Sequence, residues 1–197
     1  GHSLGPAFIL TILEEINVRV KGCILVAGFV NRLGNEEFDN LNKTFIEKEF
    51  NWSKIKQNCE QFYILQSKDD PYVAFVNGIE IAKHLNTLPI PYDKAGHFNS
   101  EAGFDTFEDL LRFCYLIEHQ QKFQVDNLVG LQSLPEKPNN KAVILLHGFG
   151  TNKHEWGRYD YETYYLTKQG YSVFRFDCTG RGESEGDYSQ TSIDVMA

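Results

Sequence analysis

The chain opens with Gly-His-Ser-Leu-Gly at residues 1–5, and this stretch fits the pattern G-x-S-x-G. In that pattern a serine stands on a sharp turn between a strand and a helix, where its Oγ is exposed. Apolar residues recur at helical spacing over residues 8–13, as such a turn requires. Five-residue patterns also occur by chance, so the alternative for Ser3 is an ordinary loop serine. We expect His2, inside the turn, to be structural.

An aspartate and a histidine stand further along the chain, each just after a strand-like run. Asp70 follows the buried strand expected at residues 62–65, and His97 follows a shorter strand-like stretch. Taken singly, Asp69 or Asp70 can cap the next helix, and a lone histidine is usually an ordinary residue. The order Ser, Asp, His favours one shared site, because parallel strands bring their carboxyl ends to the same edge of a sheet.

Together these three residues predict nucleophilic catalysis. A serine hydroxyl is a poor nucleophile at neutral pH, and His97 would remove the Ser3 proton during attack. Asp70 would hold the imidazole tautomer and stabilise the cation that forms. Loss of the serine or of the base is expected to lower the rate by several orders of magnitude.

The oxyanion formed by such an attack needs N–H donors. The N–H of Leu4, the residue after the nucleophile, is one candidate. The loop His-Gly-Phe-Gly at residues 147–150 offers a second in the Phe149 N–H, with a plain strand-to-helix turn as the alternative. This loop follows the nucleophile in the sequence, whereas the second donor normally comes from a loop that precedes it.

The rest of the chain alternates strands with helices. Residues 31–60 are polar and aromatic without a clear period, which predicts an excursion over the sheet. We expect strands at residues 23–27, 62–65, 88–92 (a short edge strand, because of its prolines), 142–146 and 171–176, a hairpin at 122–134, and helices at 74–86, 105–119 and 158–169. This alternation predicts an α/β fold with a mostly parallel sheet flanked by helices.

Composition excludes several classes of partner. The chain of 197 residues has a net charge of −8 and no basic stripe, which argues against nucleic acid. No apolar run reaches the ~18 residues needed to span a membrane, and no signal peptide is visible. Four widely spaced cysteines are typical of reduced thiols in a cytoplasmic protein. His84, His119 and His154 are expected on the surface, and no metal or cofactor is expected.

Residues 1–118 resemble the C-terminal part of the YdeN-like, retinoblastoma-binding-protein-like serine hydrolases of the α/β-hydrolase superfamily. The resemblance rests on Gly-His-Ser-Leu-Gly-Pro-Ala at residues 1–7, Asn-Trp-Ser-Lys-Ile-Lys-Gln-Asn-Cys at 51–59, Ser-Lys-Asp-Asp-Pro-Tyr-Val at 67–73 and Gly-His-Phe at 96–98. It implies an α/β-hydrolase fold and assigns the catalytic acid to Asp70 rather than Asp69. Ala74, where the family often has proline, departs from the pattern away from the chemistry.

Residues 122–197 resemble the N-terminal part of a second α/β-hydrolase, of the esterase or serine-aminopeptidase-like kind. The matching stretches are residues 143–150, 170–177 and 180–186. This order implies two partial domains, 1–118 and 119–197, in permuted order, with the tail of one hydrolase joined to the head of another. One circularly permuted domain is the rival interpretation. Because the chain opens on Gly1 and its only methionine is Met196, we expect a fragment.

We therefore expect a serine hydrolase that acts on a small acyl substrate, an ester, thioester or amide, through an acyl-serine intermediate. Small esters are the expected laboratory substrates. The alternative is a non-catalytic hydrolase fold kept as a protein-binding module, with a protein partner in place of a substrate. The complete set of Ser3, Asp70 and His97 favours the enzyme, since a binding module does not need all three.

Overall fold

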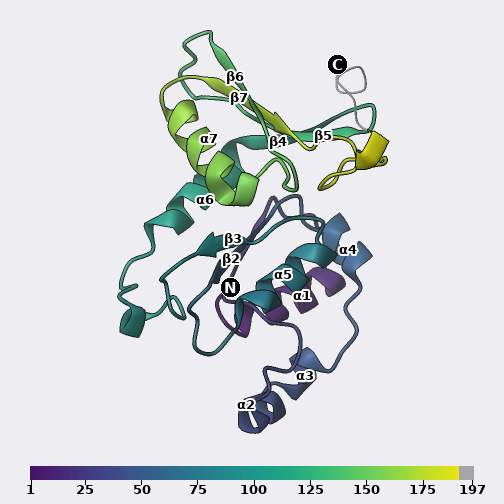
Figure 1. The fold of residues 1–197 in the computed structure, drawn as a ribbon, viewed down its shortest axis with the longest axis vertical. Helices are drawn as coiled ribbons and strands as arrows, with labels where there is room; N and C mark the ends of the chain where they lie inside the picture. Colours follow the sequence, from purple (N-terminus) through teal and green to yellow (C-terminus); the bar gives the residue numbers. More distant parts are fainter. Residues whose placement is uncertain (191–197) are drawn as a thin grey trace. The chain divides into compact units, whose positions relative to one another are not determined.

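The computed structural model describes residues 1–190 and divides them into two units, each built around its own sheet (Figure 1). The first unit holds Gly1–Leu85 and Pro89–Glu108, and the second holds Asn86–Leu88 and the chain from Asp109 onward. The division after Glu108 falls earlier than the boundary between residues 118 and 119 that the motifs suggested.

The sheet of the first unit is entirely parallel within the described residues. It contains β1 (Cys23–Val26), β2 (Phe62–Ser67) and β3 (Ile90–Tyr92), in that spatial order. All three strands lie where the sequence predicts them. The run of buried residues along β2 is typical of a central parallel strand covered on both faces, and the short, proline-containing β3 lies at the edge.

Three helices contribute the core of the first unit together with β1 and β2. They are α1 (Gly5–Glu15), α4 (Trp52–Gln57) and α5 (Phe75–His84). One fully buried aliphatic side chain comes from each of these five elements: Leu10, Leu25, Ile55, Ile64 and Ile81. The expected helices after Ser3 and after Asp70 are therefore present, and their apolar faces build the core.

The excursion at residues 31–60 is made of short helices rather than irregular chain. α2 (Glu36–Leu41) and α3 (Lys43–Ile46) come first, and α4 brings the chain back to the core (Figure 1). Asn35 and Asn51 start α2 and α4 by accepting a hydrogen bond from the backbone N–H three residues on, a common N-cap. Helices this short give no readable period, which explains why the pattern alone did not reveal them.

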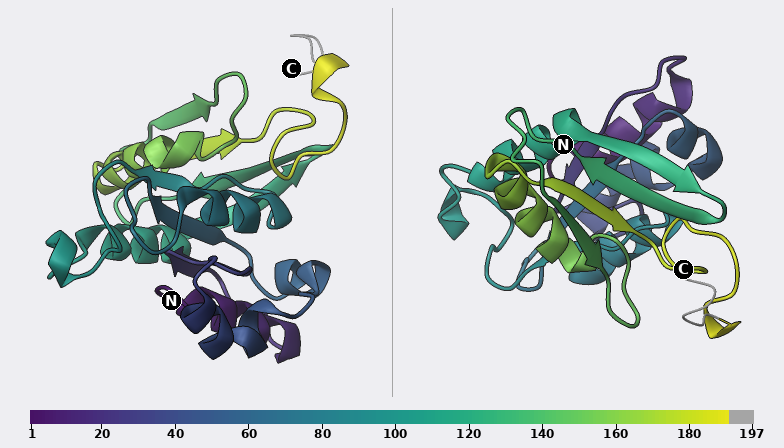
Figure 2. Two further views of the ribbon diagram at one scale, coloured as in Figure 1. Left: turned by 60° about the horizontal axis from the view of Figure 1, so that its bottom comes forward. Right: turned by 90° about the horizontal axis from the view of Figure 1, so that it is seen from above.

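The second unit contains α6 (Glu108–His119), β4 (Gln120–Val125), β5 (Leu128–Ser133), β6 (Ala142–Leu146), α7 (Arg158–Lys168) and β7 (Ser172–Phe176). The strands lie in the order β4-β5-β7-β6, and the β4–β5 hairpin is the long pair of arrows in the right-hand view of Figure 2. Only β6 and β7 pair in parallel. The expectation of a mostly parallel sheet is thus wrong for this unit, because β5 pairs with β7 in antiparallel fashion.

The edge strand of the second sheet carries exposed apolar side chains. β6 is an edge strand, with Ile144 64% and Leu146 55% exposed. Their alternate neighbours face the other side, where α7 contacts β7 and Val173 is fully buried. α7 is followed by Gly170 at a φ of +89°, as expected for a helix C-terminus. The 3₁₀ turn Tyr188–Gln190 is the last element within the described residues.

A buried ionic cluster joins the loop after β6 to the loop after β7. Lys153 Nζ donates to Asp177 at 2.6 Å and to Glu183 at 2.9 Å, and the Lys153 and Asp177 side chains are 3% and 0% exposed. Burial alone would lower the pKa of Lys153, but Asp177 and Glu183 outweigh it and raise the pKa above its usual value. Likewise burial opposes ionisation of Glu183, but Lys153 and Lys122 lower its pKa to about 2. Lys153 and Glu183 therefore both stay charged in the folded state.

His154 is buried, which corrects its expected place on the surface. Its Nδ1–H donates to the Asp160 carboxylate at 3.0 Å, and that carboxylate also binds the Arg175 guanidinium at 2.6 Å. Asp160 lies on α7 and Arg175 in the middle of β7, so the charge set is assembled from segments far apart in sequence. The prediction that His154 lies on the surface failed because no local sequence pattern indicates its contact with Asp160.

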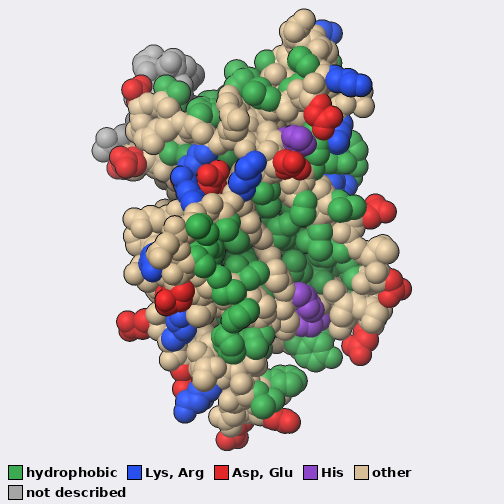
Figure 3. Space-filling model, turned by 180° about the vertical axis from the view of Figure 1, so that it is seen from behind, with side chains coloured by type: hydrophobic (Ala, Val, Ile, Leu, Met, Phe, Trp, Pro, Cys, Tyr) green, Lys and Arg blue, Asp and Glu red, His purple; other side chains and the backbone are tan. Residues whose placement is uncertain are grey.

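Exposed apolar side chains also occur on the first unit, where Figure 3 shows hydrophobic groups gathered in the lower part of the view. Phe8 and Ile12, both on α1, are 52% and 40% exposed. Within residues 1–190, no helix combines the length and the apolar character that crossing a bilayer would demand.

Candidate active site

The chain turns sharply at Ser3. The preceding residue, His2, pairs in parallel with Val26 of β1, and the Ser3 N–H donates to the Val26 carbonyl at 2.9 Å. Ser3 itself has a φ of +59°, and α1 begins two residues later at Gly5. A non-glycine residue with such a φ is uncommon and is worth a functional hypothesis. The turn is crowded at Gly1, where an added Cβ would lie 2.7 Å from Gly5, but not at Gly5 itself.

Leu4 directly follows Ser3 and occupies the N-cap position of α1. Its side chain packs against the small apolar cluster of Phe29, Ile46 and Val73, which anchors the turn. No group within residues 1–190 accepts a hydrogen bond from the Leu4 N–H. The start of a helix carries partial positive charge, so this N–H is well suited to meet a developing anion.

Asp70 and His97 meet although they come from different loops. His97 Nδ1–H donates to Asp70 Oδ2 at 2.8 Å, and the two side chains are 12% and 0% exposed. The other oxygen, Oδ1, accepts the backbone N–H groups of Tyr72 at 2.8 Å and Val73 at 2.9 Å. Three donors therefore hold this buried carboxylate, and its orientation toward the imidazole is fixed.

Asp69 supports the histidine loop rather than the next helix. Its Oδ1 accepts from Ser67 Oγ at 2.6 Å and from the N–H groups of Ala95 and Gly96 at 3.1 and 2.9 Å. The hydrogen bond from Ser67, followed by that from Gly96, lowers the pKa of Asp69 below its usual value. The alternative of a helix cap is not realised, since Ala74 is the N-cap of α5 and no side chain caps it.

The loop that carries His97 requires its glycine. Gly96 has a φ of +47°, and an added Cβ would lie 2.8 Å from the Cβ of Ala102. Phe98 follows at a φ of +51°, and its ring packs against those of Tyr92 and Phe104. This aromatic packing gives a tight turn on a rigid base, which holds the imidazole in one place.

Two residues beside His97 were not assigned to the site by sequence reasoning. The His2 ring lies 4.7 Å from the His97 ring, centroid to centroid, and its Nε2 is 2.7 Å from the His97 carbonyl oxygen. The Tyr72 ring lies at 79° to the His97 ring, with the two centroids 5.1 Å apart. His2 stands next to Ser3 in the sequence, so this contact brings the serine turn and the histidine loop together. No sequence signal predicted it beyond the position of His2 inside the motif.

Phe149 lies in the second unit and is 87% exposed. The loop around it is ordered by side chains: the Gly148 N–H donates to Glu155 at 2.9 Å, and His147 Nε2 accepts the Cys178 N–H at 2.9 Å. Ser3 and Leu4 belong to the first unit. The role of the Phe149 N–H as an oxyanion donor stays a prediction.

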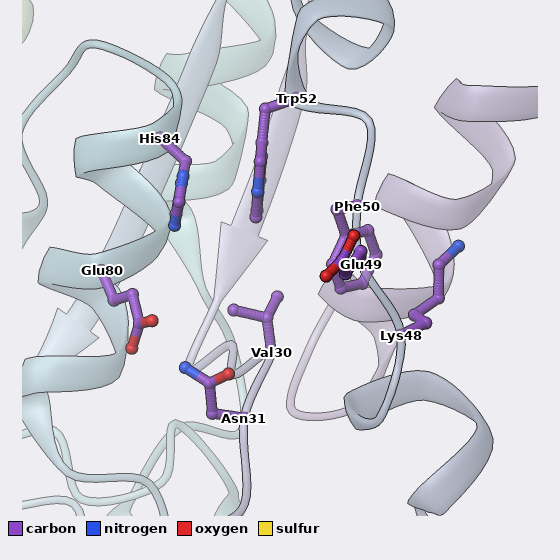
Figure 4. A pocket seen from close by; sticks show the side chains of 8 residues that line it. All are labelled: Val30, Asn31, Lys48, Glu49, Phe50, Trp52, Glu80 and His84. Atoms are coloured by element: carbon purple, nitrogen blue, oxygen red, sulfur yellow. The ribbon is translucent and has the colours of Figure 1, made fainter.

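A cavity of about 300 Å³ lies in the first unit, beside Trp52 and His84, whose rings stack at 4.4 Å (Figure 4). Phe50 and Trp52 line it and also pack against the core. None of Ser3, Asp70 and His97 lines this cavity. Within residues 1–190, no three His, Cys, Asp or Glu side chains are grouped so as to hold a metal ion.

Comparison with known proteins gives matches to both parts of the chain. The family model described as "Serine hydrolase" matches residues 1–115, and the one described as "Serine aminopeptidase, S33" matches residues 137–195. The protein "Serine hydrolase RBBP9" of Rattus norvegicus is 28% identical over 112 residues, which are 57% of this chain and 56% of that protein.

A solved structure is similar as well. The crystal structure of the ydeN gene product from B. subtilis matches with a TM-score of 0.55 and 26% identity, over 59% of this chain and 62% of that one. This chain therefore spans 56% and 62% of the lengths of these two relatives. The matches confirm the resemblance drawn from the motifs, and they support an α/β-hydrolase-like fold with sheets flanked by helices.

Proposed function

This chain belongs to the serine hydrolase family, and from that premise we propose that its first unit cleaves an ester, thioester or amide through an acyl-serine intermediate. The observation that carries the proposal is the pairing of the His97 imidazole with the buried Asp70 carboxylate, in the unit that also holds the Ser3 turn. A histidine oriented in this way is a competent general base for a hydroxyl nucleophile.

The proposed reaction runs in two halves. In the first, His97 Nε2 takes the Ser3 proton as Oγ attacks the acyl carbon, and the imidazolium then protonates the leaving alcohol, thiol or amine. In the second, His97 takes a proton from water as the water oxygen attacks the acyl carbon, the imidazolium then returns that proton to Ser3 Oγ, and the carboxylic acid is released. Asp70 keeps Nδ1 protonated throughout and stabilises the imidazolium.

The oxyanion of each tetrahedral intermediate would be met first by the Leu4 N–H. Support for this assignment comes from its place at the N-cap of α1, directly after Ser3, with no competing acceptor among residues 1–190. The other predicted donor, the Phe149 N–H, lies in the second unit, in the loop after β6. A small acyl group is the proposed substrate class.

We further propose that the second unit is the opening part of another hydrolase domain, so that the chain joins two partial domains in permuted order. Its β6-α7-β7 segment is a parallel strand–helix–strand unit, and it falls within the stretch matched by the aminopeptidase family model. The His-Gly-Phe-Gly loop follows β6 at the strand end where such folds place their chemistry.

Labelling with a fluorophosphonate probe tests the hydrolase function, because such probes bond covalently only to activated serines. We expect labelling of the wild-type chain that is abolished in Ser3→Ala and unchanged in Ser53→Ala, a matched control at an exposed serine of α4. Circular dichroism checks that both variants fold. A folded chain without labelling at Ser3 would overturn the proposal and favour the protein-binding alternative.

A further inference from the structure

The direction of one hydrogen bond beside His97 can be deduced from chemistry alone. His2 Nε2 lies 2.7 Å from the backbone carbonyl oxygen of His97. A carbonyl oxygen can only accept, so His2 Nε2 must carry the proton and donate it. This settles the state of the His2 nitrogen that faces the loop, whether the ring is neutral or charged.

His2 is joined to the strand edge and to the start of α1 through its backbone. It pairs with Val26 at the end of β1, and its own carbonyl accepts the Gly5 N–H at 2.9 Å. The His97 loop is a tight turn in which the N–H groups of Ala95 and Gly96 donate to Asp69 Oδ1. The hydrogen bond from His2 therefore links a rigid strand edge to the residue whose position matters for proton transfer.

The contact also involves the rings. The His2 and His97 rings are tilted by 52° with centroids 4.7 Å apart, and the Tyr72 ring meets His97 edge-on at 5.1 Å. Asp70 contacts the His97 ring at Nδ1. Asp70, His2 and Tyr72 are thus titratable neighbours of the His97 imidazole, and of these three His2 is the one hydrogen-bonded to the His97 carbonyl.

On the premise of the serine hydrolase function proposed above, we propose that His2 is a positioning residue for His97. Its Nε2–H holds the His97 carbonyl next to the Ser3 turn, and this contact sets the position of the imidazole relative to the nucleophile. A displacement of a catalytic group by about 1 Å can lower the reaction rate on the order of a hundredfold. Loss of this one hydrogen bond is therefore expected to lower the rate.

Two substitutions separate the donor from the ring. His2→Gln keeps an N–H donor at the end of a side chain of similar reach, and His2→Phe keeps an aromatic ring without a donor. We expect the rate of fluorophosphonate labelling at Ser3 to fall by about tenfold or more in His2→Phe and to stay near wild type in His2→Gln. With an ester substrate, kcat should fall while KM stays constant. Equal rates for His2→Phe and wild type, or equal losses in both variants, would overturn the positioning role.

A second measurement reads the same contact without catalysis. In nitrogen–proton NMR spectra of the histidine side chains, we expect the His97 Nδ1–H signal to persist in His2→Gln and to broaden or vanish in His2→Phe. If Ser3 of the wild-type chain is not labelled, the hydrolase proposal fails, and these spectra alone decide the positioning role. An Nδ1–H signal unchanged in both variants contradicts it, and selective loss in His2→Phe supports it.

Discussion

Replacing Asp70 with asparagine should reverse the tautomer of His97. In the wild-type chain Asp70 Oδ1 accepts two backbone N–H groups, from Tyr72 and Val73, and Oδ2 accepts from His97. Only the oxygen of an asparagine amide can accept the two backbone donors, so the amide nitrogen must face His97. Two donors cannot face each other, and His97 Nδ1 must therefore lose its proton and become an acceptor.

The kinetic consequence is large and the cost in stability is small. With the proton moved to Nε2, His97 cannot take the Ser3 proton, and comparable tautomer errors in serine hydrolases lower kcat by about 10⁴. The variant keeps all three hydrogen bonds around residue 70, so we expect the free energy of unfolding to change by less than about 1.5 kcal/mol, the net value of one hydrogen bond. Loss of rate without loss of fold is the signature of this mechanism.

The assay compares Asp70→Asn with Asp69→Asn, the neighbouring carboxylate as matched control. Asp69 receives its three hydrogen bonds at Oδ1 alone, which an amide oxygen can replace. We therefore expect labelling of Ser3 to be nearly unchanged in Asp69→Asn and almost absent in Asp70→Asn, with urea unfolding recorded for both. Near wild-type labelling of a folded Asp70→Asn chain would refute the tautomer argument and the assignment of Asp70 as the acid.

Three further predictions concern stability. Gly96→Ala should lower the free energy of unfolding by about 1–2 kcal/mol, because Gly96 has a φ of +47° and the new Cβ would press on Ala102; unchanged urea unfolding would contradict this. Lys153→Met should cost the second unit about 3–5 kcal/mol by leaving Asp177 buried without its cation, as measured by chemical unfolding; a neutral effect would mean that the pair contributes little. The pKa of Glu183 is lowered from 4.5 to about 2, so its stabilisation is present above pH 4.5 and lost as pH falls toward 2. Unfolding at a series of pH values should therefore show a steeper acid loss for wild type than for Glu183→Gln, and parallel curves would exclude this origin.

Local patterns were sufficient to predict the elements that build the first unit. The apolar runs of β1 and β2, the prolines of the short β3 and the helical spacing after Ser3 each act within one element, so a single sequence reveals them. The same holds for the β4–β5 hairpin. The antiparallel pairing of β5 with β7 escaped prediction because it depends on which strands meet after folding, and no residue of either strand encodes its partner.

The candidate site, too, was predicted from the sequence only in part. The chain order of Ser3, Asp70 and His97 is legible in the sequence, and the Asp70–His97 contact is present in the structure. The roles of Asp69 and His2 could not be predicted from the sequence, because each side chain binds backbone groups of the histidine loop, and any residue could supply such groups. Buried charges such as His154 were misplaced for the related reason that their partners arrive from other elements.

The left-handed backbone at Ser3 limits how this position can change over evolutionary time. A β-branched side chain is a true outlier at a φ near +59°, so threonine, the other aliphatic alcohol, is disfavoured by the main chain itself. Cysteine has no branch and meets no such barrier. Replacement of the nucleophile at residue 3 by cysteine is therefore compatible with the backbone, whereas replacement by threonine is not. The conformation of the turn, rather than the intrinsic reactivity of the side chain, sets this limit.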